Sequence, residues 1–180
     1  MRAVSSTPAP RVQPAADVKA ADCRTLIDLV RFRAATSPDK IVYRFLPGER
    51  KAELTLTHAQ LEARVGAVAA RVAEVAPKGS RALLLIPSGL DYVAAYFGCL
   101  AAGVVAVPAY PPHPRRPDPR VSAICADCEP TIALTTASLL ERMDVWRGDD
   151  ERLRRLKWIA VDDGTLAAPA TTRERPDGDF

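Results

Sequence analysis

Glycine is scarce in this chain, and its glycines never stand close together. There are nine in 180 residues, and neither G-x-x-x-x-G-K-S/T nor G-x-G-x-x-G occurs among them. Those glycine-rich loops hold phosphate groups with backbone N–H groups at a helix N-terminus. Residues 1–180 therefore contain neither a P-loop nor a dinucleotide-binding fingerprint.

A strong charge of one sign is also lacking. The net charge is +3, and like charges form no long run. This balance is too mild to favour a nucleic acid or an acidic membrane surface as a partner. Four cysteines without a secretion signal are typical of free thiols in a reducing compartment. We therefore expect a cytoplasmic protein that binds no nucleic acid.

No segment has the pattern of a signal peptide or of a true membrane span. Residues 1–20 are rich in proline and alanine without an apolar core, which predicts a disordered tail, with a transit peptide as the alternative. Residues 92–112 carry no charge and reach the length of a span. They are alanine-rich, and Gly98, Gly103 and Pro108 interrupt them. A buried helix followed by a buried strand is the better interpretation, because insertion would be weak.

The first ordered elements are expected to be a helix and a β-hairpin. Apolar residues recur at helical spacing over 26–34, and Pro38 ends that helix. Apolar side chains then alternate over 41–45, and a return strand begins at Leu54 after a polar turn.

The clearest helix of the chain begins at a capping box. Thr57 and Gln60 have the spacing at which each side chain can accept the other residue's backbone N–H. Behind them, apolar residues recur every three or four positions, as in a helix with one buried face. These residues are Leu61, Val65, Val68, Val72 and Val75.

Strands and helices alternate along the rest of the chain. Four apolar runs are expected to be buried strands, at 81–86, 104–107, 131–135 and 157–161. The helices expected between them cover 90–101, begin at Asp118–Pro119, and cover 137–146. Such alternation implies right-handed crossovers and a parallel sheet. The predicted fold class is α/β, a mostly parallel sheet with flanking helices, preceded by a helix and a β-hairpin, in one partial domain at residues 21–180.

The carboxyl ends of the four expected strands mark the edge at which open parallel sheets bind ligands. The residues at these four strand ends are Pro87-Ser88, Pro108 to Tyr110, Thr135-Thr136 and Asp162-Asp163. Ser88 could be a nucleophile, but no G-x-S-x-G surrounds it, so a helix cap is favoured. The two aspartates could bind Mg²⁺, but the glycine after them favours a turn.

Four further residues could carry chemistry. Cys125 and Cys128 form a C-x-x-C that could be a redox pair or half of a zinc site. They close a helix rather than open one and share a face with apolar residues, so core packing is favoured. His58 follows a helix cap, where we expect it to be exposed, and His113 lies among prolines. Neither has an evident partner for general acid–base work.

A proline-dense stretch follows the second strand of the expected sheet. Residues 111–117 read PPHPRRP, which could be a polyproline II peptide ligand or a rigid solvated loop. Arg115, Arg116 and Arg120 could bind phosphates, but no aromatic residues alternate with them, as they do in nucleic-acid sites.

Several segments, in the same order, resemble core motifs of adenylate-forming enzymes. LTHAQL (56–61) resembles the first core motif, L-T-Y-x-E-L, with His58 in place of tyrosine and Gln60 in place of glutamate. LAAGVVAVP (100–108) resembles the second motif. The chain continues as AYPP at 109–112, which is similar to the fatty acyl-AMP ligase branch, whereas acyl-CoA synthetases usually continue V-P-L-N-P. The resemblance covers roughly residues 24–180.

The resemblance implies an N-terminal portion of an enzyme that activates a fatty acid with ATP and Mg²⁺. The acyl-adenylate would then pass to an acyl-carrier protein or a synthetase carrier domain. The family's phosphate-binding loop, ribose-binding aspartate and catalytic lysine would all follow residue 180. The resemblance therefore assigns no catalytic, cofactor-binding or metal-binding residue within 1–180, and it implies that this portion alone is inactive.

Two other hypotheses stay open at this point. One is a portion of an acyl-CoA synthetase, which would use CoA as the acceptor. The other is a non-catalytic α/β module that presents PPHPRRP to a partner.

Overall fold

The computed structural model describes residues 20–48, 52–111, 118–142, 144, 150–164 and 171–173. The tail predicted at 1–20 lies outside these residues, except for Ala20, which begins a short 3₁₀ helix, η1 (Ala20–Asp22). Most of PPHPRRP, with His113, Arg115 and Arg116, also lies outside them.

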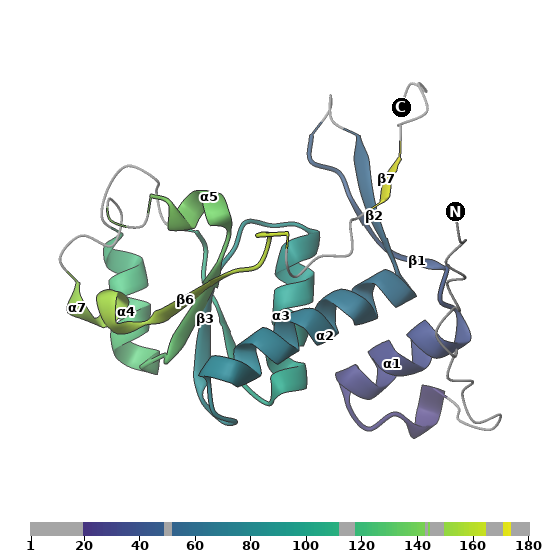
Figure 1. Cartoon of the computed structure of the whole chain (residues 1–180), viewed down its shortest axis with the longest axis horizontal. Helices are drawn as coiled ribbons and strands as arrows, with labels where there is room; N and C mark the ends of the chain where they lie inside the picture. The colour runs from purple at the N-terminus through teal and green to yellow at the C-terminus, as the bar shows by residue number, and fades with distance from the viewer. Residues whose placement is uncertain are drawn as a thin grey trace, which may run out of the picture.

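The predicted helix and β-hairpin are confirmed. Helix α1 (Leu26–Thr36) begins at a capping box formed by Thr25 and Asp28. Strands β1 (Ile41–Phe45) and β2 (Glu53–Thr57) are antiparallel. A third strand, β7 (Thr171–Arg173), pairs antiparallel with β2, so we call this three-stranded sheet the hairpin sheet. Figure 1 shows it at the end of the molecule away from α4 and α7.

The second sheet is parallel, as the alternation of strands and helices predicts. It contains β3 (Arg81–Leu85), β4 (Val105–Pro108), β5 (Ile132–Thr135) and β6 (Lys157–Ala160). Their order is β4-β3-β5-β6, and every neighbouring pair is parallel. β3 therefore lies inside the sheet, which explains its uninterrupted apolar sequence.

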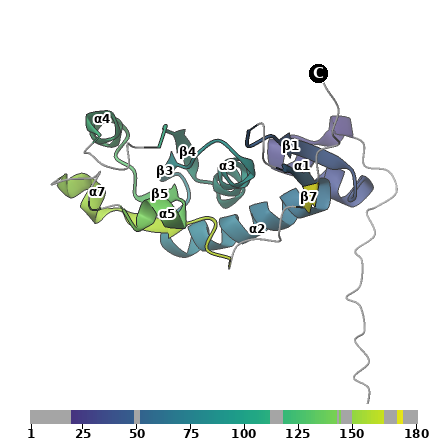
Figure 2. The ribbon, with the colours of Figure 1, turned by 90° about the horizontal axis from the view of Figure 1, so that it is seen from above.

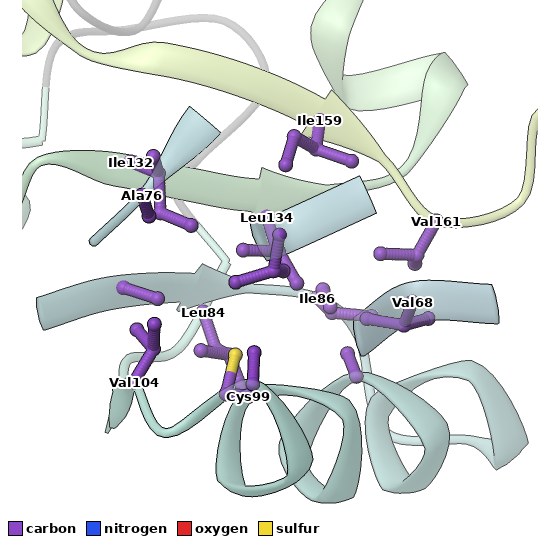
Figure 3. Close-up of a cluster of buried hydrophobic side chains, with 14 residues drawn as sticks. Val68, Ala76, Leu84, Ile86, Cys99, Val104, Ile132, Leu134, Ile159 and Val161 are labelled. Carbon is purple, nitrogen blue, oxygen red and sulfur yellow. The ribbon is translucent and has the colours of Figure 1, made fainter. Parts of the chain in front are cut away.

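Helices cover both faces of the parallel sheet. On one face lie α2 (His58–Val75) and α3 (Leu90–Ala102), which pack on Leu84 and Leu134. Figure 3 shows Cys99 of α3 pointing toward β3 beside Leu84. On the other face lie α4 (Pro119–Cys128) and α7 (Glu151–Arg155), which pack on Leu83 and Leu85. Seen from above, the strands lie between α4 and α3 (Figure 2).

The two helices α2 and α3 touch at a glycine. A Cβ atom placed on Gly98 of α3 would lie 2.6 Å from the Cβ of Val68 in α2 and closer still to its Cγ1. Carbon atoms in contact normally lie about 3.5–4.0 Å apart. The absence of a side chain at Gly98 therefore lets the two helix backbones approach closely at this point.

A smaller apolar cluster joins the hairpin sheet to these helices. Its buried members are Val30, Leu56, Leu61, Val65 and Leu90. They come from α1, β2, α2 and α3. Leu61 and Val65 of α2 therefore pack with the hairpin sheet, whereas Val68 and Val72 of the same helix pack with the parallel sheet. The capping box predicted at Thr57 and Gln60 is confirmed and fixes the start of α2, with Gln60 N–H donating to Thr57 Oγ1 over 3.3 Å.

Two predicted elements differ from the structure. β4 was expected to be buried, but it is the edge strand of the parallel sheet, and Val105 is 51% exposed. The helix expected at 137–146 is interrupted: a turn at residues 141–142 follows α5 (Ala137–Leu140), and residue 144 is helical again. Residues 143, 145 and 146 lie outside the described residues. The interpretation of residues 92–112 as a helix and a strand is confirmed up to residue 111, because α3 ends at Ala102 and β4 follows at Val105–Pro108. Among the described residues, no helix is long and apolar enough to cross a membrane.

Candidate functional site

The carboxyl edge of the parallel sheet gathers the residues that the sequence indicates. β3 leads into Pro87, Ser88 and Gly89, β4 into Tyr110, and β5 into Thr136. In Figure 1 this edge lies beside α5, which directly follows β5. Because all four strands run in the same direction, their ends meet at one edge.

A cavity of about 210 Å³ opens at this edge, between the end of β3 and the hairpin sheet. Its lining residues come from the hairpin sheet, from α2 and α3, and from the segments that follow β3 and β5. They are Phe45, Leu54, Arg64, Ile86, Pro87, Ser88, Gly89, Leu90, Asp91 and Thr136. The cavity therefore combines apolar side chains of the hairpin sheet and of the segment after β3 with the charged pair Arg64 and Asp91 and the hydroxyl groups of Ser88 and Thr136.

An ion pair between a buried arginine and a partly exposed aspartate lines this cavity and ties α2 to α3. Arg64 Nη1 lies 2.8 Å from Asp91 Oδ1, and the Arg64 side chain is only 7% exposed. Asp91 stands in the first turn of α3, where a negative charge interacts favourably with the helix dipole. The guanidinium is thus already neutralised by a carboxylate from the protein itself.

Ser88 does not cap α3, so the favoured interpretation of this residue is wrong. The N-cap residue is Gly89, which has no side chain, and no side chain accepts a hydrogen bond at this end of the helix. Ser88 is exposed at the rim of the cavity instead. Among the described residues, His58 does not line the cavity, and the Asp91 carboxylate that does line it is paired with Arg64.

Asp162 has a structural role that the sequence does not reveal. Its Oδ1 accepts a hydrogen bond from the Ala137 backbone N–H over 2.7 Å, so the end of β6 caps α5. Gly164 has φ of +78°, which fits the turn predicted after β6. Among the described residues, no group of three or more His, Cys, Asp or Glu side chains is arranged to hold a metal ion.

Arg120 joins the residues on either side of the proline-dense stretch. Its Nη2 donates to the Tyr110 carbonyl over 2.6 Å and lies 3.1 Å from Asp118 Oδ2. Its guanidinium carbon also lies 5.9 Å from the centre of the Tyr110 ring, a cation–π contact. We call Tyr110, Asp118 and Arg120 the Arg120 cluster.

Asp118 is itself held in place at the start of α4. It caps the helix by accepting from the backbone N–H groups of Arg120 and Val121, as the Asp118–Pro119 pair predicts. Partial burial raises the pKa of Asp118, but the hydrogen bonds from the Arg120 side chain and the Val121 backbone outweigh it. The pKa of Asp118 therefore lies below its ordinary value, and the carboxylate stays charged near neutral pH.

Of the two cysteines of the C-x-x-C, Cys125 packs in the core, as favoured, whereas Cys128 belongs to no core cluster. Cys125 is buried against Val121, whereas Cys128 is half-buried. Burial is the largest cause that raises the pKa of Cys125 to about 11, and burial also raises the pKa of Cys128. Both thiols therefore stay protonated near neutral pH, which is the opposite of a reactive redox pair.

His58 is half-buried rather than exposed, which corrects the expectation from sequence. Its backbone N–H donates to the Lys40 carbonyl over 3.1 Å, so the start of α2 rests on the turn before β1. Burial, and then the charges of Arg33 and Lys40, hold the pKa of His58 below its ordinary value of 6.5. The imidazole is therefore neutral at pH 7, and it lies outside the cavity.

The described residues do not form a triphosphate site. The one cation that lines the cavity, Arg64, is paired with Asp91. The Asp162 carboxylate accepts a backbone N–H. The glycine-rich loop that would surround phosphate groups does not occur in residues 1–180. What this edge provides is an amphiphilic hollow and an exposed cluster of tyrosine and arginine.

Comparison with known proteins gives consistent matches along nearly the whole chain. A family model described as AMP-binding enzyme matches residues 30–179. A medium-chain-fatty-acid–acyl-carrier-protein ligase of Moorena producens is 36% identical over 85% of this chain and 26% of its own length. A long-chain-fatty-acid–AMP ligase of Mycolicibacterium smegmatis is 35% identical over 81% of this chain and 24% of its own length.

A solved structure shares the fold. It is the fatty acyl-adenylate ligase of L. pneumophila in complex with acyl adenylate and pyrophosphate, with a TM-score of 0.69 and 31% identity. The match covers 84% of this chain and 26% of that one. The present chain thus spans about a quarter of the length of the relatives it matches.

Proposed function

Because this chain belongs to the AMP-binding enzyme family, we propose that it is the N-terminal portion of a fatty acyl-AMP ligase. The relatives confirm its resemblance to that branch. The observation that carries the proposal is the ordered series of motifs from LTHAQL to AYPP. In the structure these motifs start α2 and lead from β4 to the carboxyl edge of a parallel sheet.

The proposed reaction of the full-length protein has two steps. In the first, a carboxylate oxygen of a fatty acid attacks the α-phosphorus of ATP, which releases pyrophosphate and leaves acyl-AMP. In the second, the phosphopantetheine thiol of a carrier protein attacks the acyl carbonyl, and AMP leaves. The first step brings negative charges together, so it requires cationic groups and Mg²⁺ near the phosphates.

In this proposal, residues 21–180 are a scaffold within the adenylation domain, residues 1–20 are a tail, and the phosphate-binding loop follows in the full-length protein. Arg64 neutralises Asp91, so it is not the cation that this reaction needs. We therefore propose that residues 1–180 alone form no acyl-adenylate. The free state of all four cysteines supports a cytoplasmic location for the enzyme.

The test is fatty-acid-dependent exchange of pyrophosphate into ATP by the full-length protein. The proposal expects exchange with at least one chain length and none with residues 1–180. Absence of exchange for every chain length would overturn it. A second assay compares CoA with a holo acyl-carrier protein as the acceptor, and efficient transfer to CoA would indicate an acyl-CoA synthetase instead.

A further inference from the structure

The Arg120 cluster caps α4 and joins the two sides of the proline-dense stretch, and its Tyr110 and Arg120 are also exposed beside the carboxyl edge of the sheet. We propose that Tyr110 and Arg120 form a docking contact for the acyl-carrier protein, and that Arg120 is also the positioning residue of Tyr110. This inference rests on the proposed function, because it names where the protein partner of that function binds.

The cluster is built to hold an aromatic ring in one place. A single guanidinium donates to the Tyr110 carbonyl over 2.6 Å and lies 5.9 Å from the centre of its ring. The same guanidinium lies 3.1 Å from Asp118 Oδ2, and Asp118 is anchored on two backbone N–H groups of α4. An aromatic side chain fixed before binding loses little conformational entropy when a partner covers it.

The exposure of Tyr110 indicates a protein partner rather than a small molecule. Its side chain is 75% exposed, the largest value among the exposed large apolar residues of the described chain. No residue of the cluster lines the cavity at the end of β3, whereas small ligands are normally enclosed in a concave site. Tyrosine and arginine are the residue types that dominate binding energy in protein interfaces.

Charge indicates which kind of protein surface fits. The Arg120 side chain is 43% exposed and the Asp118 side chain only 15%, so the cluster presents its cation more than its anion. The sequence between Tyr110 and Arg120 adds two further arginines, Arg115 and Arg116, which lie outside the described residues. A complementary partner surface is acidic and has an apolar spot for the ring. We therefore expect an acidic face of the carrier protein to bind at the Arg120 cluster.

The experiment separates carrier binding from adenylate formation in the full-length protein. Acyl transfer is measured with a holo acyl-carrier protein and, separately, with free pantetheine as a small acceptor. Tyr110→Ala and Arg120→Ala are each expected to raise the KM for the carrier protein about tenfold, the effect of an interface residue that contributes appreciably to binding. Transfer to pantetheine and ATP–pyrophosphate exchange are expected to stay unchanged.

Arg152 gives a matched control. At the start of α7 it repeats the arrangement of Arg120, with Asp150 Oδ1 accepting from its backbone N–H over 2.9 Å and from its Nε over 3.2 Å. Within the described residues, Arg152 has no cation–π contact. Arg152→Ala is therefore expected to leave the KM for the carrier protein unchanged. Arg120→Lys, which keeps the charge without the planar fork, is expected to have a smaller effect than Arg120→Ala.

The dependence of the KM for the carrier protein on salt concentration is a measurement that a purely structural role of Arg120 would not change. The KM of the unmodified protein for the carrier is expected to rise with ionic strength, and Arg120→Ala is expected to flatten that rise. If the Tyr110→Ala variant does not fold, the Tyr110→Leu variant, which keeps the apolar bulk, is used in its place for transfer to the carrier protein and to pantetheine.

The outcomes are distinguishable. An unchanged KM for the carrier protein in the Tyr110 and Arg120 variants, with exchange intact, overturns this inference and leaves the proposed function standing. A loss of exchange, or an equal effect on pantetheine, overturns it too, because the cluster then serves the small substrates or the interior of the full-length protein. If the unmodified protein shows no exchange, the proposed function itself fails, and this inference fails with it.

Discussion

Replacing Gly98 with alanine is expected to force helices α2 and α3 apart. The new methyl carbon would lie 2.6 Å from the Cβ of Val68, about 1 Å inside the normal contact distance. Val68 cannot turn away, because its Cβ is fixed by the backbone of α2 and its side chain is buried in the core of the parallel sheet. One of the two helices must therefore move.

The size of the effect follows from two opposing contributions. Alanine is a better helix former than glycine by about 1 kcal/mol. An extra carbon in a well-packed core costs typically about 1–3 kcal/mol, and an overlap with a fixed Cβ belongs at the upper end of that range. We expect a net loss of about 1–2 kcal/mol in the free energy of unfolding of this helix pair.

The assay is amide hydrogen exchange of α2 and α3 in the full-length protein. A loss of that size increases exchange through local opening by roughly 5–30-fold. Gly66→Ala is the matched control, because Gly66 is an exposed residue of α2 and an added Cβ would meet nothing within 4 Å. It is expected to slow exchange slightly. Equal protection in both variants would refute the close contact between the helices.

Three further predictions concern charged and nucleophilic groups. Asp91→Ala removes the carboxylate that pairs with the mostly buried Arg64 guanidinium. Because Asp91 is 42% exposed and water can replace it, the expected loss in the free energy of unfolding in urea titrations is about 1–2 kcal/mol, still more than for Arg64→Leu. The reverse order would contradict the structure. The pKa of His58 in the folded protein lies below its unfolded value of 6.5. The contribution of His58 to the free energy of unfolding is therefore fully present above pH 6.5 and is lost as the pH falls from 6.5 toward the folded pKa. His58→Gln is expected to reduce this loss in thermal unfolding at about pH 5 against about pH 7.5, and an unchanged pH dependence would show that His58 is not its source. Burial raises the pKa of Cys99 to about 12 and is the main cause of the value of about 11 for Cys125, so both should resist iodoacetamide at about pH 8 under native conditions, and rapid labelling of either would show that the core is open.

Local sequence rules predicted the elements that depend on neighbouring residues. The capping box of Thr57 and Gln60 and the N-cap of Asp118 depend on side chains within three residues of each other, and both are present. Gly103 ends α3 in the left-handed conformation, with φ of +73°, as a glycine after a helix predicts. The alternation of strands and helices was likewise sufficient for the parallel sheet.

What depends on distant pairing could not be read from the sequence. An apolar run such as 104–107 indicates a strand but not its place in the sheet, so the edge position of β4 was missed. The pairing of β7 with β2 joins residues more than a hundred positions apart. Its three residues, two of them threonines, are too short a run to predict a strand.

The candidate site was predicted in place but not in detail. The carboxyl edge followed from the direction of the strands. The ion pair of Arg64 and Asp91 joins residues 27 apart, and the hydrogen bond of Ala137 to Asp162 joins residues 25 apart. Neither spacing has a local signature. Ser88 was assigned as a cap because serine commonly caps helices, but the helix begins one residue later, at Gly89.

The most direct test of the central claim follows the oxygen atoms of the fatty acid. The full-length protein is given ATP, a holo acyl-carrier protein and a fatty acid whose carboxyl oxygens are ¹⁸O, and the released nucleotide is analysed by mass spectrometry. Attack of the carboxylate on the α-phosphorus predicts AMP that carries one ¹⁸O atom. Unlabelled AMP, or ADP with the label in inorganic phosphate, would contradict the assignment of this chain to an acyl-adenylate-forming enzyme.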